Sequence, residues 1–312
     1  MAVTLDGLTV DLPKEWGATQ LAKGFEQSVV GQLKSGTPMN MGEYVIPQYE
    51  GGFELGYTAE MGVKPVSDVS VTAKTMSPHK FAGIVVVSKE FAKRNPVQML
   101  QYIEQDMRNA VARQVDYAIF YGKSAKTGQF VPGVDTAKNY IDATTLRTEL
   151  TNGDLVPQVL AGYNSIVGGP KADRADPSGF AFDTLLRTRL ALASQQSITL
   201  PGAPTPMPNL AGGISALGGL NIAFGRTVAG RVGTNADTKT KGFVGDWDNG
   251  LRWGFVDQID IQRSTEATIV DSAGQQVHLF QQNAMALLIE FSMGWAVMDN
   301  NYFAAYDDKV AG

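Results

Sequence analysis

The sequence predicts an α+β protein, because one long amphipathic helix stands between two regions of strand-like alternation. The helix is expected over residues 95–122, with strand patterns in residues 41–90 and again from residue 255 onward. Residues 123–250 carry both helical and strand signals and are expected to form a compact inserted lobe. The helix is thus either an ordinary core helix or a rigid spine that supports the flanking sheets.

Composition sets the outer limits of this prediction. With 312 residues, the chain is long enough for one large domain or two modest ones with a substantial core. Charged residues make up 18% and hydrophobic residues 44%, so much of the surface is weakly polar. Such a surface suits a protein covered by copies of itself, and it is also compatible with a monomer. The net charge of −5 and the pI of about 5.2 argue against a sequence-wide basic footprint for nucleic acid.

Several classes of protein are excluded by what the sequence lacks. There is no cysteine, so disulfides, thiolate metal sites and a cysteine nucleophile are impossible. The first 16 residues contain Asp6 and Asp11 and do not have the layout of a signal peptide. The longest apolar run, residues 284–298, is interrupted by Glu290 and is too short to span a membrane. We therefore expect a soluble protein with no membrane partner.

The helix over residues 95–122 has clear start and stop signals. The side chain of Asn95 can cap it, and Pro96 fits the first helical position, where its missing N–H costs nothing. Gly122 is a natural stop because it adopts the left-handed conformation without steric cost. At 1.5 Å per residue the helix would be about 40 Å long. Its apolar stripe consists of Leu100, Ile103, Met107, Ala110, Val111 and Ala118.

The stretch before this helix divides into three parts. Residues 1–40 have weak periodicity with a short helix near residues 18–34, which either packs on the main body or is an arm that orders on a neighbour. Residues 43–46 and the alternating residues 69–74 predict the two strands of a long ribbon around a glycine-rich middle. Because an isolated hairpin is marginal in water, this ribbon is expected to lie on another subunit. Residues 81–87 are more continuously apolar and predict a buried strand.

The lobe after the helix begins with helical patterns. Residues 154–167 and 180–193 are expected to be helices joined by a surface loop. Residues 197–219 are rich in proline and glycine and predict a long exposed loop, and residues 220–228 predict a strand.

The end of the chain returns to strands. Residues 255–263 alternate, and residues 268–270 and 276–280 flank a good hairpin turn at residues 271–274. Residues 283–298 predict a long and mostly buried strand.

Motifs that carry chemistry are scarce. His79 and His278 both lie in strand-like segments, and neither has a metal-ligand partner at a recognised spacing. The sequence contains neither a nucleophile elbow nor a P-loop. Asp246 and Asp248 in GDWDNG suit either a metal loop or, as we favour, a turn before a strand. The tryptophans are interpreted as packing residues. We therefore predict no catalytic, metal or cofactor site, no cofactor, and a protein that is not an enzyme.

Three stretches, taken in order, are similar to one protein family. VGDWDNGLRWGFVDQIDIQRSTEA (residues 244–267) has a G-D-[FW] turn before a strand. HLFQQNAMALLIEFSMGWAVMDNNYF (residues 278–303) has F-x-x-N, an apolar run, an acidic residue and G-x-A-V. Residues 84–122 pass from strand to long helix with D-x-A-[IF] near the helix end. Together these patterns resemble the major capsid proteins of tailed bacteriophages, which share the HK-97-type fold.

The resemblance implies a division of the chain into named parts. Residues 1–40 would be the N-terminal arm and residues 41–80 the extended loop, a β-ribbon. Residues 81–130 and 251–312 would form the peripheral domain with its spine helix, and residues 131–250 the axial domain.

The resemblance also implies a function. Identical copies would form hexamers and pentamers of an icosahedral shell that encloses the double-stranded DNA genome of a tailed phage, assembled in the host cytoplasm and found in the virion. Contact with the DNA would be non-specific. Expected partners are a portal, decoration proteins and a separate scaffolding protein. The scaffolding protein is expected to be separate because the sequence starts directly on the arm; the other reading is that assembly needs no scaffold. The alternative is an encapsulin-like bacterial nanocompartment. A cytosolic enzyme with an α/β lobe is a third hypothesis, which predicts a small oligomer.

Some members of this family cross-link neighbouring subunits by an isopeptide bond. A lysine of the extended loop attacks an asparagine, and a nearby glutamate takes the proton. Asn283 and Glu290 fall on the matching positions, and Lys64 and Lys74 are the available lysines of the loop. In the other reading, Asn283 satisfies a turn and Glu290 forms an inter-subunit salt bridge. Residues seven apart in a regular strand point to opposite faces, which argues for this second reading.

Overall fold

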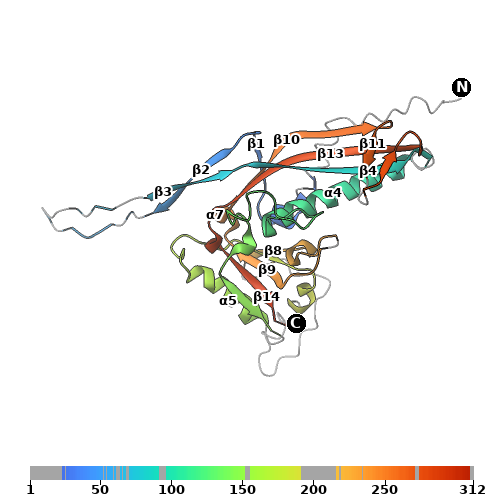
Figure 1. Cartoon of the computed structure of the whole chain (residues 1–312). Coiled ribbons are helices and arrows are strands. Elements are labelled where there is room, and N and C mark those ends of the chain that lie inside the picture. Colours follow the sequence, from blue (N-terminus) through green and yellow to red (C-terminus); the bar gives the residue numbers. More distant parts are fainter. Residues whose placement is uncertain are drawn as a thin grey trace, which may run out of the picture.

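The structure is a computed structural model, and it consists of two sheets with a long helix between them and a ribbon that projects to one side (Figure 1). The residues that it describes are 23–24, 26–51, 53, 55–58, 60, 64, 66–67, 70–90, 96–151, 155–190, 216–217, 219–233, 235–270 and 274–309.

The upper sheet, here called the long sheet, has four strands in the order β1-β10-β13-β4. They are β1 (Thr37–Met39), β10 (Leu251–Ser264), β13 (Ala284–Val297) and β4 (Pro78–Ser88). β13 is central and runs antiparallel to both β10 and β4, whereas β1 is parallel to β10. The predicted strands over residues 255–263 and 283–298 are confirmed. A small hairpin, β11 (Thr268–Val270) with β12 (Gln276–His278), is the one predicted around residues 271–274.

The long helix is α4 (Pro96–Tyr121), which lies beneath the long sheet (Figure 1). Its predicted end is confirmed, because Gly122 has a φ of +69° and its N–H donates to the carbonyl of Ala118 at 2.8 Å. The predicted cap, Asn95, lies outside the described residues. Met107 and Val111 are buried as predicted, but Ala110 is exposed, since it borders an open groove between α4 and β4.

The lower sheet has six strands in the order β5-β14-β9-β6-β8-β7. Their bounds are β5 (Arg147–Leu150), β14 (Phe303–Asp308), β9 (Thr240–Gly245), β6 (Gly179–Phe182), β8 (Leu220–Phe224) and β7 (Ala216–Leu217). The helix α5 (Leu155–Val167), predicted over residues 154–167, packs against β5 and β14. Short turns of helix connect the elements: η2 (Ile141–Ala143), η3 (Arg226–Ala229), α7 (Trp247–Gly250) and η4 (Asn300–Tyr302).

One continuous apolar core links the two sheets through α4. Phe120 of α4 stacks on Phe243 of β9, with ring centroids 5.0 Å apart. Trp247 and Trp295 are almost completely buried, which confirms that these tryptophans are packing residues; Trp16 lies outside the described residues.

The ribbon consists of β2 (Tyr44–Gly51) and β3 (Ser70–Met76), which pair antiparallel as predicted. The register shifts between Tyr49 and Gly51, so Glu50 lies in a β-bulge. A bulge bends its strand and changes the direction of the side chain. The ribbon extends away from both sheets (Figure 1).

The N-terminal part of the described chain packs on its own subunit. The helix α2 (Val29–Leu33) buries Val29 and Val30, and β1 extends the long sheet. The helix predicted near residues 18–34 is expected either to pack on the main body or to order on a neighbour. Its described part packs on the main body. Residues 1–22 lie outside the described residues.

Three predictions of local structure are wrong. Residues 180–193 are not one helix, because residues 180–182 belong to β6, a fully buried strand between β8 and β9, and only residues 186–190 of the described part are helical. A run buried on both faces has no alternation to distinguish it from a helix. Residues 81–87 are not a buried strand, since β4 is an edge strand with one exposed face. The strand over residues 220–228 ends at Phe224, where the chain turns into η3.

The last strand, β14, lies in the lower sheet, between β5 and β9. The predicted division assigned residues 251–312 as a whole to the same part as the long sheet. The chain leaves the long sheet at the end of β13, turns through η4 and completes the lower sheet. Among the described residues, no helix combines the length and apolar character that crossing a bilayer requires.

Candidate functional site

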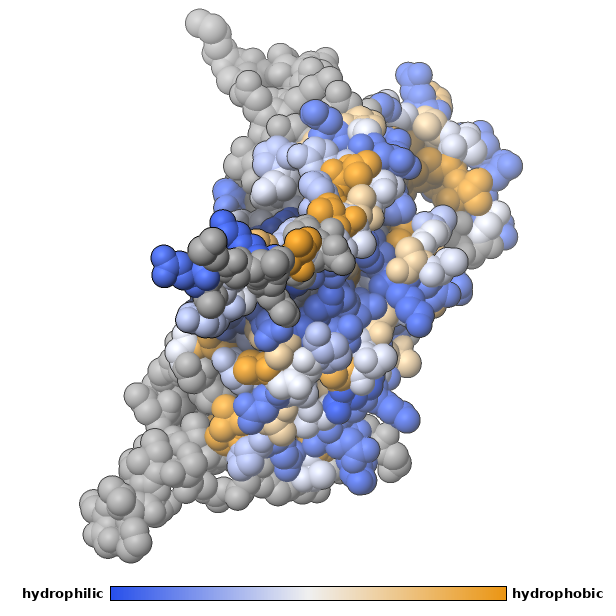
Figure 2. All heavy atoms as spheres, turned by 90° about the vertical axis from the view of Figure 1, so that its left-hand side faces the viewer, coloured by the Kyte–Doolittle hydropathy of each residue, from blue (hydrophilic) through white to orange (hydrophobic). Residues whose placement is uncertain are grey.

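The ribbon, including the residues between its two strands, exposes a concentration of large apolar side chains. Tyr57 is 97% exposed, Val66 93% and Leu55 88%. Single exposed apolar residues are normal, but a concentration on one projecting element indicates an interaction surface. In Figure 2, which views the molecule from the side to which the ribbon points, apolar groups lie among polar ones over this region. The other exposed apolar residues of the ribbon are Tyr44, Val45, Tyr49, Phe53 and Val71.

The base of the ribbon is anchored to its own subunit by a separate small core. Met76, at the end of β3, is buried together with Ala296 and Met298, and Met39 and Ile46 pack against them. The ribbon therefore starts from a fixed base, while its outer part offers side chains that nothing in the described part of the chain covers.

A second exposed apolar strip follows the edge strand β4. Ile84 is 52% exposed and Val86 is 45% exposed, and alternation places both on the same face as Lys80. Lys80 Nζ lies 2.6 Å from Glu290 Oε2 of β13, so this ion pair stands at one end of the strip. The combination of apolar side chains with a charged pair at the border is typical of a surface that meets another protein.

The four residues named for a cross-link lie in separate places. Lys64 is exposed beyond the end of β2, and Lys74 lies in β3 opposite Ile46. Asn283 is exposed just before β13, with a φ of +50°, and its carbonyl accepts from the N–H of Lys89 at 2.9 Å. Glu290 is seven residues further along β13, which corresponds to roughly 23 Å of strand.

One subunit therefore does not bring Asn283 and Glu290 together, and a cross-linking site would need residues from more than one copy. Glu290 forms an ion pair with Lys80 of its own chain. The second reading predicts its partner on another subunit. The exposed turn position of Asn283 is compatible with both readings, so the isopeptide bond stays a prediction.

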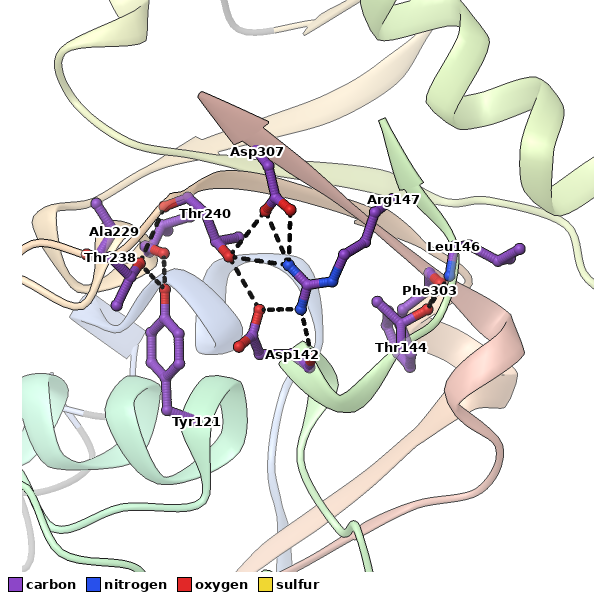
Figure 3. A network of polar contacts seen from close by, with 11 residues as sticks. Tyr121, Asp142, Thr144, Leu146, Arg147, Ala229, Thr238, Thr240, Phe303 and Asp307 are labelled. Carbon is purple, nitrogen blue, oxygen red and sulfur yellow. Dashed lines mark hydrogen bonds and ion pairs between the residues drawn. The ribbon is translucent and has the colours of Figure 1, made fainter. Parts of the chain in front are cut away.

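A polar network ties the strands of the lower sheet together (Figure 3). Arg147 of β5 donates to Asp307 of β14 at 2.8 Å and to Asp142 at 2.9 Å. Thr240 of β9 donates to Asp142 at 2.9 Å and accepts from Arg147 Nη1 at 3.4 Å, which closes a ring of contacts between Arg147, Asp142 and Thr240. Burial raises the pKa of Asp142, against the opposing effect of the Arg147 charge. Because these groups satisfy one another, the network is interpreted as structural.

A buried carboxylate joins the N-terminal segment to the long helix. Asp116 of α4 accepts the N–H groups of Val29 and Val30, at 3.1 and 3.0 Å, and the hydroxyl of Thr227 at 2.7 Å. Burial raises the pKa of Asp116 from its usual 3.8 to about 6, although the three hydrogen bonds oppose this shift. This carboxylate fastens the start of α2 to the C-terminal part of α4.

Sequence reasoning missed Asp116, although a signal for it was present. The residue lies in VDYAIF (residues 115–120), where it is the one charged residue in an otherwise apolar part of the helix. A charge in such a position must be paired or hydrogen-bonded when it is buried. The partners themselves, 86 and 87 residues away, have no signal in the sequence.

The described residues do not contain a group of three or more His, Asp or Glu side chains close enough to hold a metal ion. Asp246, considered for a metal loop, instead caps α7, because its Oδ1 accepts from the N–H groups of Asp248 and Asn249 at 3.1 and 2.9 Å. The favoured reading of GDWDNG as a turn before a strand is thus confirmed, with the turn closed by a single helical turn.

We call the lower sheet, with the helices and turns that pack on it, the lower body. Taken together, this self-contained lower body, the projecting apolar ribbon and the long sheet with its exposed strip define a structural subunit that is completed by its neighbours. Comparisons with known proteins agree with this class. The model of the phage capsid family matches residues 9–308. The "Probable major capsid protein gp17" of Mycobacterium phage D29 is 24% identical over 307 residues, which cover 96% of this chain and 91% of that protein.

Solved structures give the same result. A structure from Gordonia phage Cozz is 30% identical with a TM-score of 0.72, and the alignment covers 91% of this chain and 87% of that one. A structure from Mycobacterium phage Ogopogo, at 23% identity and a TM-score of 0.71, shows the shared fold over 90% of this chain and 92% of that one. Nothing in these comparisons favours the nanocompartment alternative.

The chain belongs to the phage capsid family. Its fold is the HK-97-type fold, as the resemblance implied. As a capsid protein it is a component of the virion and assembles with copies of itself into a shell.

Proposed function

We propose that this chain is the major subunit of an icosahedral shell around a double-stranded DNA genome, and that its ribbon lies across a neighbouring subunit. The observation that supports this is the exposure of Leu55, Tyr57 and Val66, each more than four-fifths exposed on the isolated chain. Burial of apolar surface contributes about 25 cal/mol per Å², so a ribbon that docks on a neighbour converts this exposed surface into assembly energy. The role is structural, not enzymatic.

The parts of the chain would have separate tasks in the shell. The domain division given above, with an arm, an extended loop, a peripheral domain and an axial domain, stays part of this proposal, with β14 contributing to the lower sheet. Hexamers and pentamers would use the same ribbon contact at slightly different angles. A separate scaffolding protein, a portal and decoration proteins are proposed partners, and assembly is proposed to occur in the host cytoplasm.

Contact with packaged DNA is proposed to be weak and non-specific. The net charge of −5 gives no strongly positive lining, and such a lining would hold DNA that must later leave the shell.

Electron microscopy of particles assembled from this chain, with and without nuclease, tests the proposal. Uniform angular shells, filled with nuclease-protected DNA when taken from infected cells, are expected. Small shells filled with protein and made by uninfected bacteria would instead indicate a nanocompartment. Small oligomers at every concentration would contradict both readings.

The isopeptide prediction has its own test. In that reaction the lysine Nζ forms a bond to the side-chain carbonyl carbon of Asn283, the bond to the amide nitrogen breaks, and ammonia leaves while Glu290 of a neighbour receives the lysine proton. Mature particles boiled in denaturant would then give ladders of high-mass species on a gel, and Asn283→Ala would abolish them. Comparing Lys64→Arg with Lys74→Arg identifies the lysine. A clean monomer band from wild-type particles would exclude the cross-link.

A further inference from the structure

The ribbon has a second support beyond its base, and this support comes from the turn that follows α5. Lys171 follows α5 in the turn over residues 168–175, and its Nζ lies 2.7 Å from Glu50 Oε2 at the outer end of β2. Arg174, in the same turn, donates from Nη1 to the carbonyl oxygen of Tyr49 at 3.3 Å, and its guanidinium lies 5.8 Å from the centroid of the Tyr49 ring. Two cations of one turn thus hold two consecutive residues of the ribbon.

These contacts lie at the point where the ribbon bends. Glu50 is the bulged residue of β2, and its other oxygen accepts from the Thr72 hydroxyl of β3 at 3.0 Å, so both ribbon strands are engaged. The next residue, Gly51, has a φ of +84°, and a Cβ there would overlap the guanidinium of Arg174. The local sequence therefore leaves room for the arginine against the backbone at the bend.

The turn that carries Lys171 and Arg174 is itself rigid. The carbonyl of Lys171 accepts from the N–H groups of Arg174 and Ala175, at 2.9 and 2.8 Å. The N–H of Asp176 donates to Asp246 Oδ2 at 3.2 Å, which ties the turn to the start of α7. Because the turn is hydrogen-bonded internally and to the start of α7, we expect it to carry the position of the lower body to the ribbon.

The charges at the support are balanced and half-buried. Lys171 Nζ also lies 3.3 Å from Asp299 Oδ2, and the side chains of Lys171, Glu50 and Asp299 are only 20–24% exposed. Asp299 Oδ1 accepts from the N–H of Asn301, so this second carboxylate is fixed as well. The hydrogen bond from Lys171 lowers the pKa of Glu50, and the hydrogen bond to Glu50 raises the pKa of Lys171. Partly buried ion pairs are screened by salt less than exposed ones.

We propose that Lys171 and Arg174 are positioning residues that hold the outer end of β2 against the lower body and so fix the direction in which the ribbon leaves the subunit. We call Lys171, Arg174, Tyr49 and Glu50 the ribbon strut. The inference rests on the proposed function, in which the ribbon contacts a neighbouring copy. The direction of that contact sets the angle between adjacent subunits, and a closed shell of hexamers and pentamers requires this angle to stay within a small range.

The first test measures the ribbon in the unassembled full-length subunit. The chain has no cysteine, so the double substitution Val71→Cys and Leu160→Cys allows a spin label on the ribbon and another on α5. Double electron–electron resonance should give one narrow distance population. Adding Lys171→Met should replace it with a broad or shifted distribution, and Lys171→Arg should restore the narrow population.

The matched control is Lys309→Met, which removes the 2.9 Å ion pair with Glu149 on the same body without contact to the ribbon. It should leave the distance distribution unchanged. If Lys171→Met also leaves it unchanged, the strut does not position the ribbon and the inference is overturned. This result does not depend on whether shells form, so it is separate from the test of the proposed function.

The second test measures shells. Wild-type chain and Lys309→Met should give particles of one diameter, whereas Lys171→Met should give a spread of diameters and fewer closed particles, with an unchanged melting temperature of the subunit. Shells of Lys171→Met as uniform as wild type would contradict the inference. If the wild-type chain fails to form shells, the proposed function is contradicted. The distance measurement on the unassembled subunit then decides whether the ribbon strut positions the ribbon.

Discussion

The lower sheet and the ribbon are built from similar apolar residues but bury them in opposite ways. Every residue of β6 and β9 is buried, and Phe243 and Tyr306 have no exposed surface. The ribbon leaves Tyr57 almost fully exposed. The lower sheet completes its core within one chain, whereas the ribbon keeps its apolar surface for another copy. Stability and assembly should therefore depend on different residues.

The largest expected effect separates these two regions directly. Phe243→Ala removes a ring that stacks on Phe120, and deletion of a buried aromatic side chain costs about 3–5 kcal/mol of unfolding free energy. Leu55→Ser in the ribbon should change the unfolding free energy by less than about 0.5 kcal/mol, because the side chain is already in water. Denaturant titration of unassembled subunits measures both values.

Assembly should respond in the reverse order. Leu55→Ser together with Tyr57→Ser should prevent shell formation, as measured by sedimentation, while the folded subunit persists. Normal shells from this double variant would contradict the claim that the ribbon keeps its apolar surface for contact with another copy.

The second prediction concerns Asp116, which connects α2 to α4. Its pKa of about 6 lies above the usual 3.8, so the folded chain binds the proton more tightly than the unfolded chain does. Stability should therefore fall as the pH rises from about 4 to about 6, by on the order of 3 kcal/mol from this group. Asp116→Asn should remove this part of the pH dependence, as measured by denaturation at pH 4.5 and pH 7.

The control for that prediction is Asp106→Asn on the same helix, where the carboxylate is 76% exposed. It should leave the pH dependence of wild type intact. The same slope in Asp116→Asn as in wild type would mean that the Asp116 carboxylate is not the group that titrates, and that the contact with α2 does not sense pH.

The third and smallest effect compares two tyrosine hydroxyls. The hydroxyl of Tyr306 donates to the carbonyl of Val159 at 2.6 Å in the buried core, so Tyr306→Phe leaves an unpaired acceptor and should cost about 1–2 kcal/mol. Tyr57→Phe removes a hydroxyl that is exposed on the ribbon and should not change the unfolding free energy. Equal effects of the two substitutions would show that the ribbon is already packed in the free subunit.

The features that the sequence predicts well are long and periodic. α4 has a proline at its first residue and a glycine at its end, and the ribbon and β13 have alternation or apolar runs of sufficient length. The sequence does not distinguish β6 from a helix, because GFAF is apolar throughout and too short for either period to dominate. The sequence also predicts too much burial for β4, because an apolar run does not reveal whether its strand lies at an edge of the sheet.

Contacts between distant residues are the part that the sequence does not contain. Lys171 and Glu50 are 121 residues apart, and nothing in either segment indicates the other. The same holds for the pairing of β14 with β5 and β9, which depends on the route of the chain between the two sheets. The candidate cross-link residues could be named from the resemblance, and the separation of Asn283 and Glu290 along a strand could be predicted as well. The ion pair between Glu290 and Lys80 of the same chain became apparent only from the fold.

Hydrogen–deuterium exchange, compared between the unassembled subunit and the assembled shell, tests the central distinction most directly. The account predicts that amides of residues 44–58 and 70–76 gain strong protection on assembly, whereas those of β6 and β9 are equally protected in both states. Protection of the ribbon that is the same before and after assembly, or a lower sheet that becomes protected only in the shell, would contradict it.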